Sequence, residues 1–186
     1  MTDGVLAGRK VGLREPRRED VEALFTLDAD AEHASLTEMR PFQPLSLAAR
    51  QAEYDKRQTE TDPTSARFTI QRLDDESGVA IGNVGLWGID QHHRSAHIGI
   101  SLLPVARGQG LGRDAVEVIV GFAFRIRGLA RVSLDTLDVN APMRATALAC
   151  GFVEEGRLRS AGWYLGRRVD EVIYGLLADE WPARQT

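Results

Sequence analysis

The chain has 186 residues, of which 43% are hydrophobic and 27% charged. This is ordinary globular composition, so we expect one folded domain over residues 1–186 rather than a disordered chain. The net charge of −4 and the lack of a long basic run argue against a nucleic-acid binder. No apolar run reaches about 18 residues, so no membrane span is expected. The single cysteine, Cys150, precludes an internal disulfide and favours a cytoplasmic location.

The first half of the chain changes from a helical to an alternating pattern. A short strand is predicted before Pro16, and an acidic amphipathic helix after it. A second helix is predicted to begin after Ser46, whose hydroxyl suits a helix N-cap. Three segments rich in strand formers follow, and the turn residues between them predict an antiparallel meander. The strands predicted here are 11–15, 67–73, 80–89 and 95–103, and the second helix runs toward residue 60.

The second half alternates between helices and strands. Apolar residues recur at helical spacing over 111–126, and Gly128 is predicted to end that helix. Asn140 is a good N-cap for a short helix that Gly151 stops. The strands predicted in this half are 132–139, 152–159 and 169–177.

Arg107-Gly108-Gln109-Gly110-Leu111-Gly112 lies between an apolar strand and an amphipathic helix. Three alternating glycines allow a tight turn and a close approach to a ligand. The unpaired N–H groups and positive dipole of the helix start favour a phosphate, and Arg107 and Arg113 add positive charge. The Gly-Lys-Ser/Thr ending of a Walker loop is missing, and the dinucleotide G-x-G-x-x-G spacing is not met. By itself this pattern is equally compatible with a structural glycine turn.

The wider sequence narrows the choice. Arg107-x-x-Gly110-x-Gly112 after a strand resembles the CoA-pyrophosphate motif of the GNAT superfamily of N-acyltransferases. Asn140, Gly151-Phe152 and Glu155-Gly156 resemble its second motif. The ending from Val169-Asp170 to Glu180-Trp181, and the opening Leu13-Arg14 with Glu19-Asp20, resemble the branch of ribosomal-protein and spermidine acetyltransferases. The likeness covers nearly the whole chain.

This resemblance implies a single-domain α/β fold with a mostly antiparallel central sheet of about seven strands and helices on both faces. It implies acetyl-CoA, or another acyl-CoA, as cosubstrate and no metal. The thiol arm of the cosubstrate is expected along the strand backbone at Leu102 and Leu103. The diphosphate is expected at the N–H groups of Gly108, Gln109, Gly110, Leu111, Gly112 and Arg113. Asn140 is expected to reach the arm, with a plain helix cap as the alternative.

His97 stands where many relatives carry a glutamate that accepts the proton of the amine. A histidine suits this role, since its unperturbed pKa is near 6.5. The alternative is an ordinary packed or exposed strand histidine. His92 and His93 fall in a predicted turn and are expected to be solvated.

Two positions depart from the family pattern. Relatives often place a serine or a tyrosine as proton donor where this chain has Met143 and Ala147, which cannot donate. Tyr164 and Tyr174 are substitutes to consider, although a packing role is the simpler interpretation of each. Cys150 is expected to be a small buried residue rather than a nucleophile.

The leading hypothesis is therefore acyl transfer, by default of acetyl, to a primary amine of a small molecule, polyamine or protein N-terminus by direct attack. Acidic residues near the start favour a cationic amine, although a solvated helix face explains them as simply. These residues are Glu15, Glu19, Asp20, Glu22, Asp28, Asp30 and Glu32. The alternatives are a catalytically weak CoA-binding sensor and an interaction module that keeps the fold. Since family members are often dimers, a homodimer is a candidate assembly.

Overall fold

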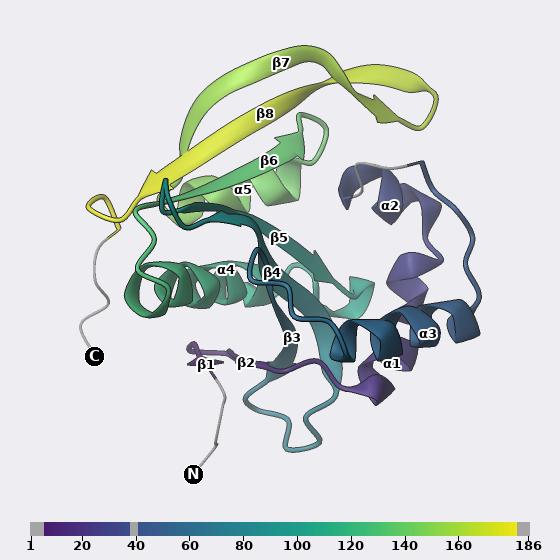
Figure 1. Cartoon of the computed structure of the whole chain (residues 1–186). Coiled ribbons are helices and arrows are strands. Elements are labelled where there is room, and N and C mark those ends of the chain that lie inside the picture. The colour runs from purple at the N-terminus through teal and green to yellow at the C-terminus, as the bar shows by residue number, and fades with distance from the viewer. Residues whose placement is uncertain (1–5, 38–40, 182–186) are drawn as a thin grey trace.

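The computed structural model describes residues 6–37 and 41–181. In this part of the chain, eight strands form one sheet in the order β1-β2-β3-β4-β5-β6-β8-β7 (Figure 1). All neighbouring pairs are antiparallel except β5 and β6, which are parallel. The strands are β1 Leu6–Ala7, β2 Val11–Arg14, β3 Ala66–Arg72, β4 Ala80–Asp90, β5 Ser95–Leu102, β6 Arg131–Leu137, β7 Val153–Tyr164 and β8 Arg167–Leu177.

Helices cover both faces of this sheet, as expected (Figure 1). The apolar side chains of α4 join the main core against β2 to β6, while α1 packs on the opposite face against β4. The five α-helices are α1 Arg18–Asp28, α2 Ala31–Thr37, α3 Leu47–Gln58, α4 Leu111–Gly121 and α5 Ala141–Ala149. A 3₁₀ turn, η1 Pro104–Ala106, precedes α4, and a π turn, η2 Phe122–Ile126, widens its end. No helix among the described residues is long and apolar enough to cross a membrane.

The sequence-based boundaries hold with three differences. β1 is an eighth strand that was not predicted, because two residues are too short to show an alternating sequence pattern. The acidic segment is divided into α1 and α2, and Asp30 accepts hydrogen bonds from the first N–H groups of α2. The last two strands extend to a tight turn at Leu165-Gly166, where both residues have positive φ. This turn lacks the usual Asn-Gly signature, so the strands were predicted too short.

Two caps were predicted correctly. The Ser46 hydroxyl accepts from the Ala49 N–H at 3.2 Å at the start of α3. The Asn140 side chain accepts from the Met143 N–H at 3.3 Å at the start of α5. After the π turn, Gly128 adopts a left-handed φ of 63°, which ends the helical segment where it was expected to end.

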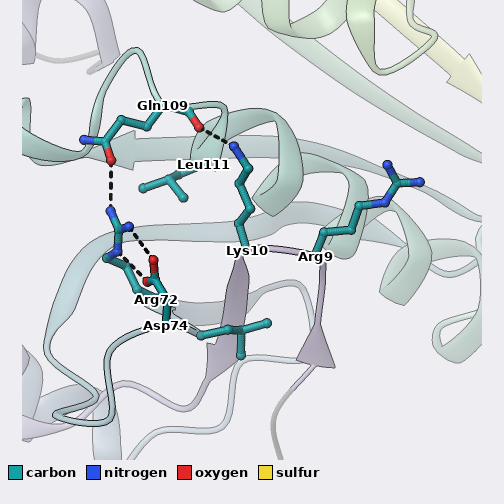
Figure 2. Close-up of a pocket in the computed structure, with 7 residues that line it drawn as sticks. Arg9, Lys10, Arg72, Asp74, Gln109 and Leu111 are labelled. Atoms are coloured by element: carbon teal, nitrogen blue, oxygen red, sulfur yellow. Dashed lines mark hydrogen bonds and ion pairs between the residues drawn. The ribbon is translucent and has the colours of Figure 1, made fainter.

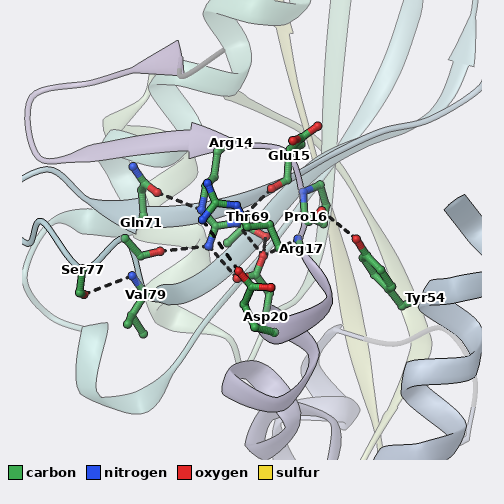
Figure 3. Close-up of polar contacts among 12 residues, drawn as sticks. Arg14, Glu15, Pro16, Arg17, Asp20, Tyr54, Thr69, Gln71, Ser77 and Val79 are labelled. Atoms are coloured by element: carbon green, nitrogen blue, oxygen red, sulfur yellow. Dashed lines mark hydrogen bonds and ion pairs between the residues drawn. The ribbon is translucent and has the colours of Figure 1, made fainter. Parts of the chain in front are cut away.

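A buried ion pair fastens α1 to the face of the sheet opposite α4 (Figure 3). Both terminal nitrogens of Arg14 donate to the carboxylate of Asp20, at 2.6 and 2.7 Å. The Arg17 N–H and the Thr69 hydroxyl donate to the same carboxylate. Burial alone would raise the pKa of Asp20, but these hydrogen bonds and the Arg14 charge hold it below its ordinary value. The ionised pair is therefore the native form at neutral pH.

Replacing Asp20 with Asn should lower the free energy of unfolding by about 3 kcal/mol at pH 7, because Arg14 then keeps a buried charge without its partner. The pKa of Asp20 is lower in the folded than in the unfolded protein. The stabilisation that its carboxylate contributes is therefore fully present above the pKa of the unfolded protein. It is lost as the pH falls through the folded value. Urea unfolding between pH 7 and 3 should therefore show a shallower acid dependence for Asp20→Asn. Glu22→Gln, at an exposed position of the same helix, should behave like the wild type, and an equal loss in both variants would contradict this account.

Candidate functional site

The sheet opens between β5 and β6. Their pairing covers only Ser95–His97 opposite Arg131–Ser133. Beyond His97, β5 continues beside β4 alone, and β6 continues beside β8 alone. Figure 1 shows the two strands diverging from this point. Backbone groups that face the gap have no strand partner, so the gap can accept an extended ligand.

The backbone of Leu102 faces this gap, and that of Leu103 faces away. The Leu103 N–H donates to the Ile81 carbonyl at 2.9 Å and so belongs to the β4 side. Backbone groups alternate between the two edges of a strand, which places those of Leu102 and Ile100 on the opposite edge. The Leu102 carbonyl accepts from Arg107 Nε at 3.0 Å. Ile100, which the sequence did not single out, thus shares the gap-facing edge with Leu102.

The glycine turn connects the open end of β5 to α4. Gly108 and Gly110 have φ values of 73° and 77°, a left-handed conformation that side chains rarely adopt. Gly110 is the N-cap of α4, which begins at Leu111. The first N–H groups of this helix have no intrahelical acceptor and lie at the positive end of its dipole. A Cβ on Gly112 would lie 3.2 Å from Leu102 Cδ1, so the helix packs closely on β5 at this glycine.

Basic side chains from earlier parts of the sequence lie beside this turn (Figure 2). Lys10 Nζ donates to the Gln109 carbonyl at 2.8 Å, and Arg72 donates to Gln109 Oε1 at 2.9 Å. With Arg9 and Leu111 they line a pocket of about 460 Å³. Lys10 and Arg72 were missed from sequence, because only the fold brings them to a turn lying 99 and 37 residues away.

Asp114 holds the β1–β2 connection in place beneath α4. Its buried carboxylate accepts the N–H groups of Arg9, Lys10 and Val11 at 2.8 to 3.0 Å. A Cβ on Gly8 would overlap the Asp114 carboxylate, so this close approach also needs a glycine. The position of Lys10 beside the glycine turn therefore depends on Asp114, in the first helical turn of α4.

The two arginines predicted to flank the turn have protein partners. Arg107 donates to the Leu102 carbonyl and lies 3.3 Å from Nδ1 of His33 on α2. Burial, and then the Arg107 charge, lower the pKa of His33. Arg113 pairs with Glu117 at 3.0 Å one helical turn away, on the exposed surface of α4. In this structure Lys10 is thus the cation bonded to the backbone of the turn.

Asn140 acts as a structural cap. Its oxygen accepts from the Met143 N–H, and its Nδ2 donates to the Thr136 hydroxyl at 3.1 Å. An amide nitrogen has two hydrogens, so one N–H remains for a ligand. The cap and the predicted binding role are therefore compatible.

His97 is the last β5 residue paired with β6 and so lies at the apex of the gap. Its ring stacks on Trp87, with centroids 4.3 Å apart and planes at 21°. Its Nδ1 lies 3.4 Å from Oδ2 of Asp135 on β6. The side chain is 38% exposed, so a ligand in the gap can reach it.

The two positions where relatives carry a proton donor, and the two tyrosines considered as substitutes, are all engaged elsewhere. Ala147 is fully buried and Met143 packs against the core. The buried Tyr174 hydroxyl accepts from Arg144 and donates to Glu154. The Tyr164 hydroxyl donates to Glu32 on α2 at 3.0 Å. Both tyrosines therefore have structural partners.

Cys150 is buried, and its thiol contacts the Arg113 carbonyl at 3.7 Å. Burial raises the pKa of this thiol to about 11, so the reactive thiolate is scarce at neutral pH. This agrees with the expected packing role.

Several of the early acidic residues also have structural roles. Asp20 is buried against Arg14, Asp30 caps α2, and Glu32 accepts from Tyr164. The side chain of Asp28 lies outside the described residues. Glu15, Glu19 and Glu22 are exposed, so the acidic surface near the start is smaller than the sequence suggests.

Comparison with known proteins shows that most of the chain is similar to N-acetyltransferases. The model of the acetyltransferase (GNAT) domain family matches residues 10–153. A Bacillus subtilis (strain 168) protein, named as a candidate ribosomal N-acetyltransferase, is 33% identical over 104 residues, which are 56% of this chain and 57% of the relative. The spermidine N(1)-acetyltransferase of Vibrio cholerae serotype O1 is 31% identical over 109 residues, or 59% and 61% of the two chains. The matched regions thus span less than two thirds of these two curated relatives.

The fold is shared over a longer stretch. The crystal structure of spermidine N-acetyltransferase from Vibrio cholerae in complex with CoA and spermine superimposes with a TM-score of 0.80 and 26% identity. The superposition covers 91% of this chain and 96% of the other. The overall fold of this chain is therefore shared with that enzyme.

Two substitutions at Asn140 measure how much its helix cap contributes to stability. Asn140→Ala should lower the free energy of unfolding by about 1 kcal/mol, because the Met143 N–H loses its acceptor. Asn140→Ser keeps a capping oxygen and should lose at most a few tenths of that, or about 0.3 kcal/mol. Urea unfolding of both variants measures this difference. Equal stability of the alanine variant and the wild type would show that the cap contributes nothing.

Proposed function

The chain belongs to the GNAT acetyltransferase family, and we propose that it transfers the acetyl group of acetyl-CoA to a primary amine. The observation that carries this proposal is the continuity of the opened strand and the glycine turn. The gap-facing edge of β5 runs from His97 to Leu102, and the turn begins five residues later at Arg107. One elongated ligand with an anionic end fits this arrangement.

The anionic end of the cosubstrate has a matching surface. The N–H groups from Gly108 to Arg113 and the start of α4 suit a diphosphate, because phosphates bind at helix N-termini. Lys10 adds positive charge at the same turn, and Arg9 borders the pocket beside it. Arg72 bonds Gln109 there, but its charge is balanced by an ion pair with Asp74 at 2.7 Å. We assign the phosphates of CoA to this pocket and turn together.

The thiol arm follows the open edge of β5. Leu102 and Ile100 offer backbone groups there, whereas the Leu103 N–H is bonded to β4. Arg107 Nε donates to the Leu102 carbonyl, so the Arg107 side chain would lie beside the bound arm. About 3.3 Å of strand per residue places His97 ~17 Å from Leu102 along β5. The thioester would then lie near the apex of the gap, and the spare N–H of Asn140 would reach the arm from α5.

The reaction needs a neutral amine. An alkyl amine with a pKa near 10 costs about 4 kcal/mol to deprotonate at pH 7, and an N-terminal amine near 8 costs about 1 kcal/mol. His97 at the apex is the group we assign to accept this proton. The nitrogen lone pair forms the C–N bond, and the C–S bond breaks with its electron pair on sulfur. The nitrogen loses two protons in all: His97 takes the ammonium proton before attack and passes it to solvent, and it takes the second after the C–N bond forms. The thiolate takes a proton from solvent, because Met143 and Ala147 cannot supply one.

The acceptor is proposed to be a cationic amine. The relatives and the solved structure that carry spermidine or spermine in their names support this class. Polyamines, aminoglycosides and a basic peptide N-terminus all offer a primary amine beside further positive charge. Acetyl is proposed over longer acyl groups because the relatives are named for acetyl transfer.

Acetyl-CoA should raise the melting temperature by about 5–10 °C at a hundredfold excess over its Kd, because it binds only the folded protein. Gly110→Asp should abolish the shift, since it places a carboxylate where the phosphates would bind. Gly128→Asp is the matched control: it has a similar positive φ but lies outside the turn, and it should keep the shift. A wild type without any shift would refute acetyl-CoA binding. Binding without thiol release on any amine of a panel would favour the sensor alternative.

His97→Ala should lower kcat by about a hundredfold or more and leave the Kd for acetyl-CoA unchanged, because the residue acts on the amine proton. Thiol release with spermidine, an aminoglycoside and a basic peptide measures turnover. His92→Ala removes an exposed histidine of the nearby 91–94 turn and should keep full turnover. Unchanged kcat in His97→Ala would exclude His97 as the base.

A further inference from the structure

The ring of His97 is held on more than one side. Trp87 covers one ring face, with the two planes nearly parallel. A Cβ built on Gly88 would lie 3.7 Å from His97 Cδ2, so the β4 backbone also approaches one edge. These contacts limit the ring to a small range of orientations.

The two ring nitrogens have different surroundings. Nδ1 is inaccessible to solvent and has no hydrogen-bond partner among the described residues, although Asp135 Oδ2 is only 3.4 Å away. The two groups are therefore in contact but not aligned. The side chain as a whole is 38% exposed, so solvent reaches other atoms of this residue. A buried nitrogen beside a carboxylate has one natural state, which is N–H.

Other charges lie on the same face of the sheet. Glu171 on β8 follows Asp135 diagonally, and burial and then the Asp135 charge raise the pKa of Glu171. Arg131 on β6 forms an ion pair with Glu155 on β7, and the two side chains occupy the space above Gly175 of β8. These groups leave Asp135 as the charged residue that contacts His97 in the described structure.

The remaining elements near this face place their charges elsewhere. Arg67 on β3 lies opposite Gly85, which is two residues from Trp87 along β4, and burial lowers the pKa of Arg67. On α2, Glu32 is bonded to Tyr164, and His33 lies beside Arg107.

We propose that Asp135 is the positioning residue of His97, accepting a hydrogen bond from Nδ1–H and thereby keeping Nε2 free to take the amine proton. This rests on the proposed function, in which His97 is the base. The carboxylate fixes the tautomer, and it stabilises the imidazolium that forms when Nε2 accepts the proton. The Nδ1–Oδ2 distance falls into hydrogen-bonding range, about 2.7–3.2 Å, through a small side-chain rotation. No proton passes to Asp135: the imidazolium returns the Nε2 proton to solvent after transfer.

Kinetics in two backgrounds tests whether Asp135 acts through His97. Asp135→Ala should lower kcat about a hundredfold in the wild type, because the base loses its orientation, and leave KM for acetyl-CoA unchanged. The same substitution in His97→Ala should have no further effect. Asp135→Glu should recover part of the activity. An equal loss in both backgrounds would overturn the proposal. So would a raised KM for a polyamine with unchanged kcat, which would identify Asp135 as a contact of the substrate's charge.

The tautomer gives a readout that needs no turnover. Spectra of ¹⁵N-histidine-labelled full-length protein should show His97 as the Nδ1–H tautomer. Asp135→Asn, which keeps the side-chain volume, should convert it to Nε2–H. Glu171→Gln removes the neighbouring carboxyl and should leave the His97 tautomer unchanged. The same tautomer in wild type and Asp135→Asn would overturn the proposal. If no amine is acetylated, the proposed function fails while these spectra still decide the relation between Asp135 and His97.

Discussion

The loss of pairing between β5 and β6 after His97 is the constraint on which the rest of the site depends. β6 is held by seven residue pairs with β8, and β5 by a long ladder with β4, so neither strand can turn back to close the gap. Unpaired backbone groups in such a gap need water or a ligand. The sheet thus keeps a gap between two stable halves, bordered by β5 on one side and β6 on the other. α4 begins at the open end of this gap.

The elements around the gap come from distant parts of the chain. α4 and the turn follow β5 directly, while the lysine and arginine beside the turn come from the β1–β2 connection and from β3. At the other end, α2 reaches both the turn, through His33 and Arg107, and the β7–β8 hairpin, through Glu32 and Tyr164. α2 therefore connects the two half-sheets on the side where they separate.

Sequence reasoning found the features with a local cause. Gly110 and Asn140 were identified because turn conformation and helix capping depend on a few neighbouring residues. The alternating patterns of β3 to β5 and the helical pattern of α4 were equally local. The sheet opening, the pocket lining by Lys10 and Arg72, and the contact between His97 and Asp135 could not be predicted this way. Each depends on strand register, which brings together residues up to 99 positions apart. The family resemblance supplied the expected path of the thiol arm, but only the structure shows that the Leu103 N–H is bonded to β4 and that the backbone of Leu102 faces the gap.

Asp114 has a consequence for how the protein is made. Its carboxylate binds three backbone N–H groups that lie 103 to 105 residues earlier in the chain. During synthesis on the ribosome, the connection between β1 and β2 has to wait for about a hundred further residues before its anchor emerges. Contacts of such long sequence separation form late and slow folding, because a large loop must close first. The β1–β2 connection is thus translated well before its anchor and is among the last parts of the fold to find its place.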